Sequence, residues 1–241
     1  MNLSELYSLA KHAATAAGSF LLENKHKKKE IYKEEGRDIK LELDRESEIL
    51  IKSILNDSSI PVIGEEFGRD LCENTNLTWV VDPIDGTSNY YRGIDQCCVS
   101  IALMEKDISK VGVIYNFNTK ELFSAFSGGG AFLNEKKINV SDIEIKSNAS
   151  LTTGFTASES LKSSYSYLNE LTGWKKVRMF GSAALSCAYV ASGRCDVYAE
   201  KGVYIWDIAA GMCLVEEAGG KIACEKIDED RYAVNFTNGR L

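Results

Sequence analysis

Histidine is scarce in this sequence, with only His12 and His26 among 241 residues. Both lie in or beside the first predicted helix, far along the chain from the acidic motifs described below, so a catalytic Ser-His-Asp triad is not expected. The seven cysteines are scattered and form no C-x-x-C pair, which argues against a disulfide framework and against a zinc site. We therefore expect reduced thiols, most of them packed in the core, and a cytoplasmic location.

Positive charge is also in short supply, because 28 Lys and Arg residues face 35 Asp and Glu residues and the net charge is −7. Such a chain has no basic field to attract nucleic acid or an anionic membrane, and we expect neither as a partner. No apolar run is long enough to span a membrane, and Glu5, Lys11 and His12 interrupt the stretch where a signal peptide would be continuously apolar. An anionic substrate would need a local positive anchor, such as a metal ion.

The first part of the chain combines helical and strand patterns. Apolar residues at helical spacing predict an amphipathic helix over about 3–24 and a second helix over about 44–55, with a strand or hairpin over 33–43 between them. Short β-type runs separated by turn residues follow, at 61–63, 79–81, 99–103, 111–115, 121–126 and 131–133. We expect a largely antiparallel sheet with two helices packed on it. The glycines at 128–130 lack the context of a phosphate-binding P-loop and predict a hairpin turn.

After about residue 140 the pattern alternates between strands and helices. The expected strands are 151–155, 177–180, 196–199 and 221–223, and the expected helices lie near 159–171, 183–192 and 207–218. With no Pro-rich or Ser-rich linker between the two parts, we expect them to share an interface. The sequence thus predicts an N-terminal α+β half, 1–139, and a smaller C-terminal α/β half, 140–241.

The most informative stretch is 79–89, where a hydrophobic strand leads directly into D-P-I-D-G-T-S-N. Asp82 and Asp85 flank a turn that Pro83 makes rigid. Around such a turn both carboxylates and the intervening Ile84 carbonyl can converge on a hard cation, which prefers oxygen ligands. This part of the loop is therefore a candidate metal site.

The residues that follow suit an anion. Gly86 allows close backbone approach, and Thr87 and Ser88 can begin a helix whose free N–H groups attract negative charge. One loop would then supply both a metal site and a phosphate cradle. Taken alone, the loop is explained equally well as a surface turn, because Asp, Pro and Gly are turn residues in any case.

Two further acidic segments favour the functional interpretation. Gly64-Glu65-Glu66 ends a predicted strand with paired acids, and Trp206-Asp207 opens a predicted helix whose small residues, 208–211, allow close packing. Each is a weak signal alone, since an aspartate at a helix N-terminus is normally a cap.

Together the three segments resemble the inositol monophosphatase family of Mg²⁺-dependent, lithium-sensitive phosphatases. The matching motifs are G-E-E at 64–66, D-P-I-D-G-T-x-N at 82–89 and W-D-x-A-A-G at 206–211, in the family's order. The resemblance covers nearly the whole chain. It implies an α+β fold, a layered α/β/α/β/α sandwich with an antiparallel N-terminal sheet and a smaller C-terminal α/β half that closes the site.

The resemblance also implies two Mg²⁺ sites that share one carboxylate. The ligands of the first would be Glu65, Asp82 and the Ile84 carbonyl, and those of the second Asp82, Asp85 and Asp207. Glu65 and Thr87 would orient the attacking water, and metals of this kind can clamp both the attacking and the leaving oxygen. Backbone N–H groups of the loop would hold the phosphate, and the proposed contacts are Gly86, Thr87 and Ser88.

Further positions follow from the same resemblance. Asp44 would help to bind a third, weaker Mg²⁺, although without the family it is only a helix cap. Glu200 and Ala183 would contact the substrate, and an acceptor-only carboxylate suits the hydroxyl groups of a polyol better than a second phosphate. The family is commonly dimeric, so a homodimer is expected.

Other phosphatase chemistries do not fit the spacing. A cysteine-dependent phosphatase needs five residues between its Cys and Arg, but six separate Cys187 from Arg194, and a haloacid-type enzyme needs D-x-D where this chain has D-x-x-D. The substrate stays open among an inositol phosphate, a sugar phosphate, fructose 1,6-bisphosphate, histidinol phosphate and an adenosine bisphosphate. A non-catalytic regulatory protein with the same fold is the remaining alternative, and such a protein should have lost a metal carboxylate or the threonine.

Overall fold

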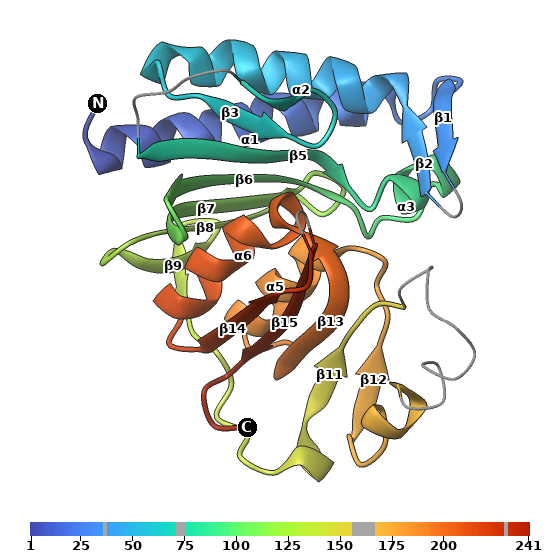
Figure 1. Cartoon of the computed structure of the whole chain (residues 1–241), viewed down its shortest axis with the longest axis vertical. Helices are drawn as coiled ribbons and strands as arrows, with labels where there is room; N and C mark the ends of the chain where they lie inside the picture. Colours follow the sequence, from blue (N-terminus) through green and yellow to red (C-terminus); the bar gives the residue numbers. More distant parts are fainter. Residues whose placement is uncertain (36–37, 71–75, 156–166, 229–230) are drawn as a thin grey trace.

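The computed structural model describes residues 1–35, 38–70, 76–155, 167–228 and 231–241. From top to bottom in Figure 1 its layers are helices, a large sheet, helices again and a smaller sheet. This arrangement confirms the layered α+β fold class. Of the helix predicted near 159–171, residues 159–166 lie outside the described residues, and residues 167–170 are helical.

The large sheet has the strand order β10-β9-β8-β7-β6-β5-β3-β4. Its neighbouring strands pair antiparallel except for β3 and β5, which are parallel, so the expected largely antiparallel sheet is confirmed. The strands are β3 (Val62–Gly64), β4 (Gly68–Arg69), β5 (Leu77–Asp85), β6 (Cys98–Glu105), β7 (Ile108–Asn116), β8 (Glu121–Phe126), β9 (Gly130–Leu133) and β10 (Lys136–Ile138). The predicted glycine turn connects β8 to β9.

Helices cover both faces of this sheet. They are α1 (Leu3–Asn24), α2 (Glu42–Leu55), α5 (Ala183–Ala191) and α6 (Ile205–Glu217). Successive residues of a strand point to opposite faces. Val81 of β5 accordingly packs in a core cluster with α1 and α2, whereas Val80 packs in a second cluster with α5 and α6. The C-terminal helices thus lie directly against the sheet that carries the D-P-I-D loop.

The smaller sheet has the order β12-β11-β13-β15-β14 and covers the other side of α5 and α6. It is mixed, because β11 is parallel to β12 and β13 while β15 is antiparallel to β13 and β14. The strands are β11 (Ser150–Thr152), β12 (Lys176–Arg178), β13 (Val197–Tyr204), β14 (Lys221–Lys226) and β15 (Arg231–Thr237). We did not predict β15, although its alternating Tyr232, Val234 and Phe236 could have indicated a strand. The division into two halves near residue 140 stays a prediction.

A small antiparallel hairpin, β1 (Ile31–Glu35) and β2 (Asp38–Leu41), lies outside both sheets and confirms the hairpin predicted between the first two helices. It sits next to the short helix α3 (Thr87–Arg92), at the right of Figure 1, near the end of β5. The remaining helical turns are η1 (Asn56–Ser58) and η2 (Lys146–Asn148). The hairpin is therefore placed beside the predicted metal loop.

The six cysteines in the described part of the chain are free thiols, and all but Cys224 are buried, as expected for core residues. In the same residues, no helix combines the length and the apolar character needed to cross a membrane.

Candidate metal centre

The D-P-I-D segment forms the end of β5 rather than a separate turn. β5 continues to Asp85, but its pairing with β6 shifts register between Asp82 and Asp85, so the strand is irregular where the carboxylates lie. Such an irregularity re-aims side chains at the end of a strand. Both carboxylates are buried, and the Ile84 N–H donates to Asp82 Oδ1 at 3.0 Å.

Asp85 is held by the start of α5. Its Oδ2 accepts hydrogen bonds from the Ser182 hydroxyl and from the Ala184 N–H at 2.9 Å, and its Oδ1 accepts a longer one from the Ala183 N–H at 3.3 Å. Ser182 is the N-cap of the helix. These contacts cross from the C-terminal helix to the D-P-I-D loop, so the two parts of the chain are joined at the site.

Asp207 lies in the first turn of α6. The helix begins at Ile205, two residues before the predicted start, so Asp207 is its third residue. The Tyr204 N–H donates to Asp207 Oδ2 at 2.7 Å. This is the reach of an N3 side chain back to the residue before the helix. Our prediction that the helix begins at Asp207 was therefore wrong by two residues.

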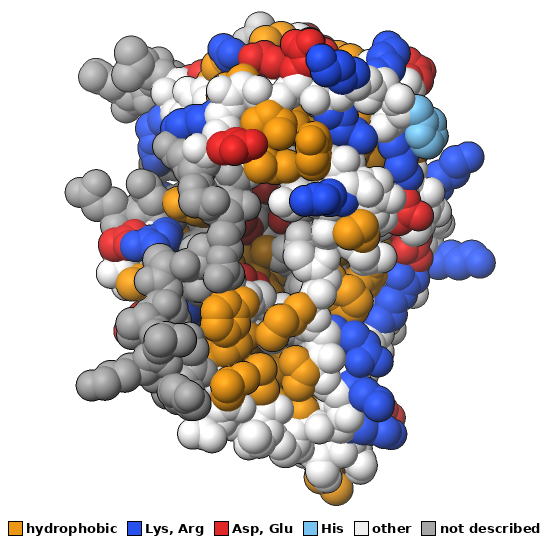
Figure 2. Space-filling model, turned by 90° about the vertical axis from the view of Figure 1, so that its right-hand side faces the viewer, with side chains coloured by type: hydrophobic (Ala, Val, Ile, Leu, Met, Phe, Trp, Pro, Cys, Tyr) orange, Lys and Arg blue, Asp and Glu red, His pale blue; other side chains and the backbone are white. Residues whose placement is uncertain are grey.

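One carboxylate oxygen from each of Asp82, Asp85 and Asp207 lies within 4.8 Å of the others. The face of the molecule toward which β5 runs is hollowed, and acidic side chains are visible inside the hollow (Figure 2). Burial, and then repulsion among these acids, raises the pKa of Asp82 and of Asp207 well above the usual value, and burial also raises the pKa of Asp85. Hard oxygen donors packed this closely out of water fit a divalent cation such as Mg²⁺.

Glu65 follows β3 and faces the same cluster. Its N–H donates to Val81 O at 3.2 Å, and its carboxyl group shares a hydrogen bond with that of Asp82. Burial raises the pKa of Glu65 to about 7, against the opposing effect of Lys40. The Nζ of Lys40 lies 3.4 Å from Glu65 Oε1.

The sequence analysis missed Glu48, which shapes the turn after Glu65. This buried carboxylate accepts the N–H groups of Glu66 at 2.8 Å and of Phe67 at 3.3 Å. A Cβ added to Gly64 would lie 1.9 Å from Glu48 Oε1, so only glycine leaves room for the carboxylate. Glu48 lies on the buried face of α2, and the available signal was an acid at helical spacing with Ile51 and Leu55.

Asp44 and Thr87 lie together beside the loop. Asp44 is 1% exposed, and its carboxylate accepts the Leu41 N–H at 2.6 Å and the Thr87 hydroxyl at 3.2 Å. The same hydroxyl lies 2.9 Å from Ile84 O. Asp44 is therefore a cap of α2 from its third position, and its role toward a third metal ion stays a prediction.

The helix predicted to begin at Thr87 is α3, and its binding of phosphate stays a prediction. Gly86 has φ +87° and precedes the first helical residue, Thr87, and a Cβ on Gly86 would lie 2.8 Å from Gln96 O. Both features require glycine. Ser88 is exposed, so its side chain is open to solvent.

Glu200 lies on β13, where the Tyr198 hydroxyl donates to its Oε2 at 3.1 Å. Burial raises its pKa to about 7. The negative charge of Asp85 raises the pKa of Glu200 further. Ala183 is half-buried at the start of α5. Their contact with a substrate stays a prediction.

This geometry agrees with the comparisons to known proteins, in which the profile of the inositol monophosphatase family matches residues 2–233. The chain belongs to this family. It is 36% identical to an inositol-1-monophosphatase from Synechocystis over 252 aligned residues, covering 100% of this chain and 87% of that protein. It is also 40% identical to the Nus factor SuhB of Xylella fastidiosa over 220 residues, covering 87% of this chain and 78% of that protein.

The fold of the inositol monophosphatase family is equally clear among solved structures. The structure of inositol monophosphatase from Anabaena aligns over 100% of this chain and 93% of its own, with a TM-score of 0.85 and 34% identity. The extragenic suppressor protein SuhB of Bartonella henselae aligns over 97% and 93%, with a TM-score of 0.87 and 31% identity. The predicted family is therefore confirmed.

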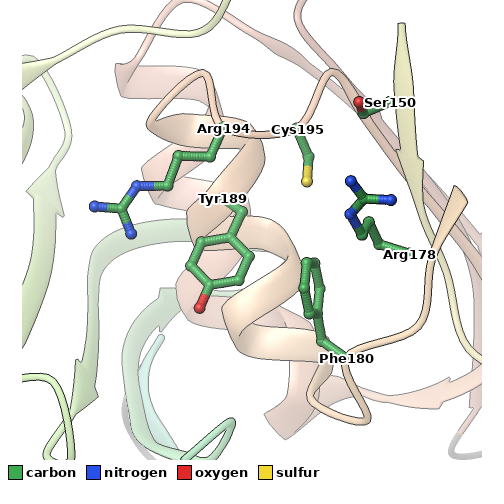
Figure 3. A pocket seen from close by; sticks show the side chains of 6 residues that line it. All are labelled: Ser150, Arg178, Phe180, Tyr189, Arg194 and Cys195. Atoms are coloured by element: carbon green, nitrogen blue, oxygen red, sulfur yellow. The ribbon is translucent and has the colours of Figure 1, made fainter. Parts of the chain in front are cut away.

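A separate pocket of about 240 Å³ in this inositol monophosphatase family member lies outside the acidic cluster. It is lined by Ser150, Arg178, Phe180, Tyr189, Arg194 and Cys195 (Figure 3). Arg194 is paired with Glu121 at 2.5 Å, and Figure 3 shows the Arg178 guanidinium near Cys195. Phe180 connects the pocket to the metal loop, because its carbonyl accepts the Asn89 side chain at 2.7 Å.

Proposed function

We propose that this chain is a Mg²⁺-dependent phosphatase that hydrolyses the monoester of a small metabolite, with an inositol or sugar phosphate as the substrate class. One observation carries the proposal, namely that the buried Asp82 and Asp85 and the partly buried Asp207 each bring a carboxylate oxygen to within 4.8 Å of the others. Membership of the inositol monophosphatase family supports the same reaction class.

The residues present fit magnesium. Glu65, Asp82 and the Ile84 carbonyl would hold one ion, and Asp82, Asp85 and Asp207 a second, all through oxygen atoms. The Ile84 carbonyl accepts the Thr87 hydroxyl at 2.9 Å and keeps a second lone pair for a metal. Bound Mg²⁺ would neutralise phosphate charge and make a nearby water easier to ionise.

The protein's own groups would position the reactants. Glu65 can accept a hydrogen bond from the attacking water, and the Thr87 hydroxyl, which lies between Ile84 O and Asp44 Oδ1, can orient the same water. The backbone N–H groups of Gly86, Thr87 and Ser88 would donate to the phosphate oxygens. Donors that are already in place when charge builds on the phosphate stabilise the transition state.

The substrate preference rests on Glu200 and Ala183. Glu200 is a partly buried carboxylate, so it can accept hydrogen bonds from hydroxyl groups of an inositol or a sugar. A relative at 36% identity is named an inositol-1-monophosphatase. A bisphosphate nucleotidase or a fructose-1,6-bisphosphatase is the alternative within the same superfamily. We also propose a homodimer, which light scattering would test.

A regulatory protein without catalysis is the rival from another class, since several relatives carry the name Nus factor SuhB. A protein without catalytic activity does not need a complete set of metal ligands. This chain has kept Glu65, Asp82, Asp85, Thr87 and Asp207. That retention favours the phosphatase.

The test is phosphate release from the five candidate substrates, in Mg²⁺ and in EDTA. We expect metal-dependent release from at least one of them. Asp82→Asn should abolish that activity, while Asp95→Asn, which changes an exposed aspartate paired with Lys25, should not. Failure of the wild-type protein on all five in Mg²⁺ would refute the proposal.

A further inference from the structure

The hairpin of β1 and β2 is attached to the segment that carries Glu65. The hydroxyl group of Tyr32 donates to Glu66 Oε2, and the Nζ of Lys40 donates to Glu66 Oε1 at 2.9 Å. The side chain of Glu66 is only 1% exposed. A carboxylate buried to this degree needs its hydrogen-bond partners, so Glu66 holds the hairpin in place.

Strand geometry explains why Lys40 reaches this position. Neighbouring residues of β2 point to opposite faces, and Leu41 is completely buried in the core that contains α1 and α2. Lys40 therefore points the other way, toward the acidic hollow. The side chain is 24% exposed, so most of it is enclosed.

The ammonium group of Lys40 contacts a second carboxylate, because its Nζ lies 3.4 Å from Glu65 Oε1. Glu65 thus has a hydrogen bond to Asp82 on one side and a lysine on the other. An Mg²⁺ ion bound to Oε1 on the hairpin side would lie about 2.1 Å from that oxygen and keep several of its own waters. The ammonium group of Lys40 already occupies the space that this Mg²⁺ and its waters would need, and its positive charge repels the ion.

We propose that Lys40 is a built-in cation of this site, which takes the place of a third metal ion on the hairpin side of Glu65. The inference rests on the proposed function, because it assumes that Glu65 is a ligand of the inner ions. Two ions then saturate the wild-type protein, so this proposal replaces the expectation that Asp44 helps to bind a third ion. The position of the lysine is set by Glu66 and not by the metal concentration.

The experiment counts metal ions directly. Crystals of wild-type protein and of Lys40→Met are soaked in the same concentrations of Mn²⁺ and inorganic phosphate, and anomalous difference peaks are counted. We expect two peaks in the wild type and a third peak beside Glu65 in Lys40→Met. Lys40→Arg keeps the positive charge and should show two.

Lys52→Met is the matched control, since Lys52 is also 24% exposed and pairs at 2.6 Å with Asp70, which is not in the acidic cluster. It should show two peaks. If Lys40→Met does not fold, Lys40→Gln can still donate a hydrogen bond to Glu66 and should also show three peaks. Three peaks in the wild type, or only two in both uncharged Lys40 variants, would overturn the inference.

The proposed function fails in a different way. Fewer than two peaks in the wild type would contradict the two-metal set of Glu65, Asp82, Asp85 and Asp207, whatever the Lys40 variants show. Two wild-type peaks with an unchanged count in the variants would leave the phosphatase intact and remove only the role of Lys40.

Discussion

Removal of divalent cations should make the stability of this protein fall as the pH rises. The acids of the metal centre are buried beside one another, and burial raises the pKa values of Glu65, Asp82 and Asp207 above their usual values. Each of these groups then loses its proton at a lower pH in the unfolded chain than in the folded protein. Raising the pH therefore favours unfolding when no metal is bound.

The size of the effect follows from Glu65, whose pKa rises from 4.5 to about 7. The stabilisation from its proton is fully present below about pH 4.5 and is lost as the pH rises through about 7. Between pH 5 and pH 8 the loss is roughly 2–3 kcal/mol for this residue. For a chain of this length that corresponds to a fall in Tm of roughly 5–10 °C. Asp82 and Asp207 act in the same direction.

Differential scanning fluorimetry in EDTA and in saturating Mg²⁺, at pH 5 and at pH 8, measures this directly. We expect Tm to fall with pH in EDTA, and Mg²⁺ to stabilise the protein more at pH 8, because protons compete with the metal for the carboxylates. Glu65→Gln should reduce the fall, whereas Glu105→Gln, at an exposed residue paired with Lys110, should leave it unchanged. A Tm in EDTA that is flat or rises with pH would refute the reasoning.

Three further predictions concern activity. Asp82→Asn removes the charge of the shared ligand and should lower kcat by on the order of 10³ without unfolding the protein, so a purified variant with roughly a tenth of wild-type kcat would contradict the two-metal assignment. Glu200→Ala should lower kcat/KM for a polyol phosphate by roughly 10- to 150-fold but leave kcat/KM for p-nitrophenyl phosphate nearly unchanged. The difference between the two substrates should grow as the pH rises through about 7, where Glu200 becomes ionised. Equal losses on both substrates would argue for a structural role. Li⁺ should inhibit uncompetitively or noncompetitively toward substrate, which steady-state kinetics would measure. If activity is unchanged in tens of millimolar Li⁺, the protein belongs to a lithium-resistant branch of the family.

Local sequence was sufficient for several helices and strands of the N-terminal part. The helix predicted over 3–24 matches α1, and the strand predicted over 121–126 matches β8. The residue types of the D-P-I-D-G-T loop drew attention to it, but its role as a metal site was inferred only together with the G-E-E and W-D segments, through the family resemblance. The two acids at helix starts, Asp44 and Asp207, were also visible, although the helices begin two residues earlier because both side chains reach back from the third position.

The partners of these acids were not predictable in the same way. Asp85 is held by Ser182 and Ala184, which lie almost a hundred residues further along the chain. Glu48 reaches the turn after Glu65 because α2 packs on β5, and Lys40 reaches Glu65 from the hairpin. Contacts of this kind depend on the three-dimensional packing of elements, and a single sequence carries no signal for which charged residues will meet.

The way in which backbone groups hold the acids determines what the metal contributes. Asp207 accepts the Tyr204 N–H at Oδ2, and Asp82 accepts the Ile84 N–H at Oδ1, so each has one oxygen fixed by the main chain and the other available to the cluster. Asp85 is anchored by the first N–H groups of α5. The positive ends of α5 and α6 also reduce the cost of burying negative charge. Because these anchors lie in helices and in a strand, we expect a bound metal to balance the charge of the carboxylates rather than to assemble the site.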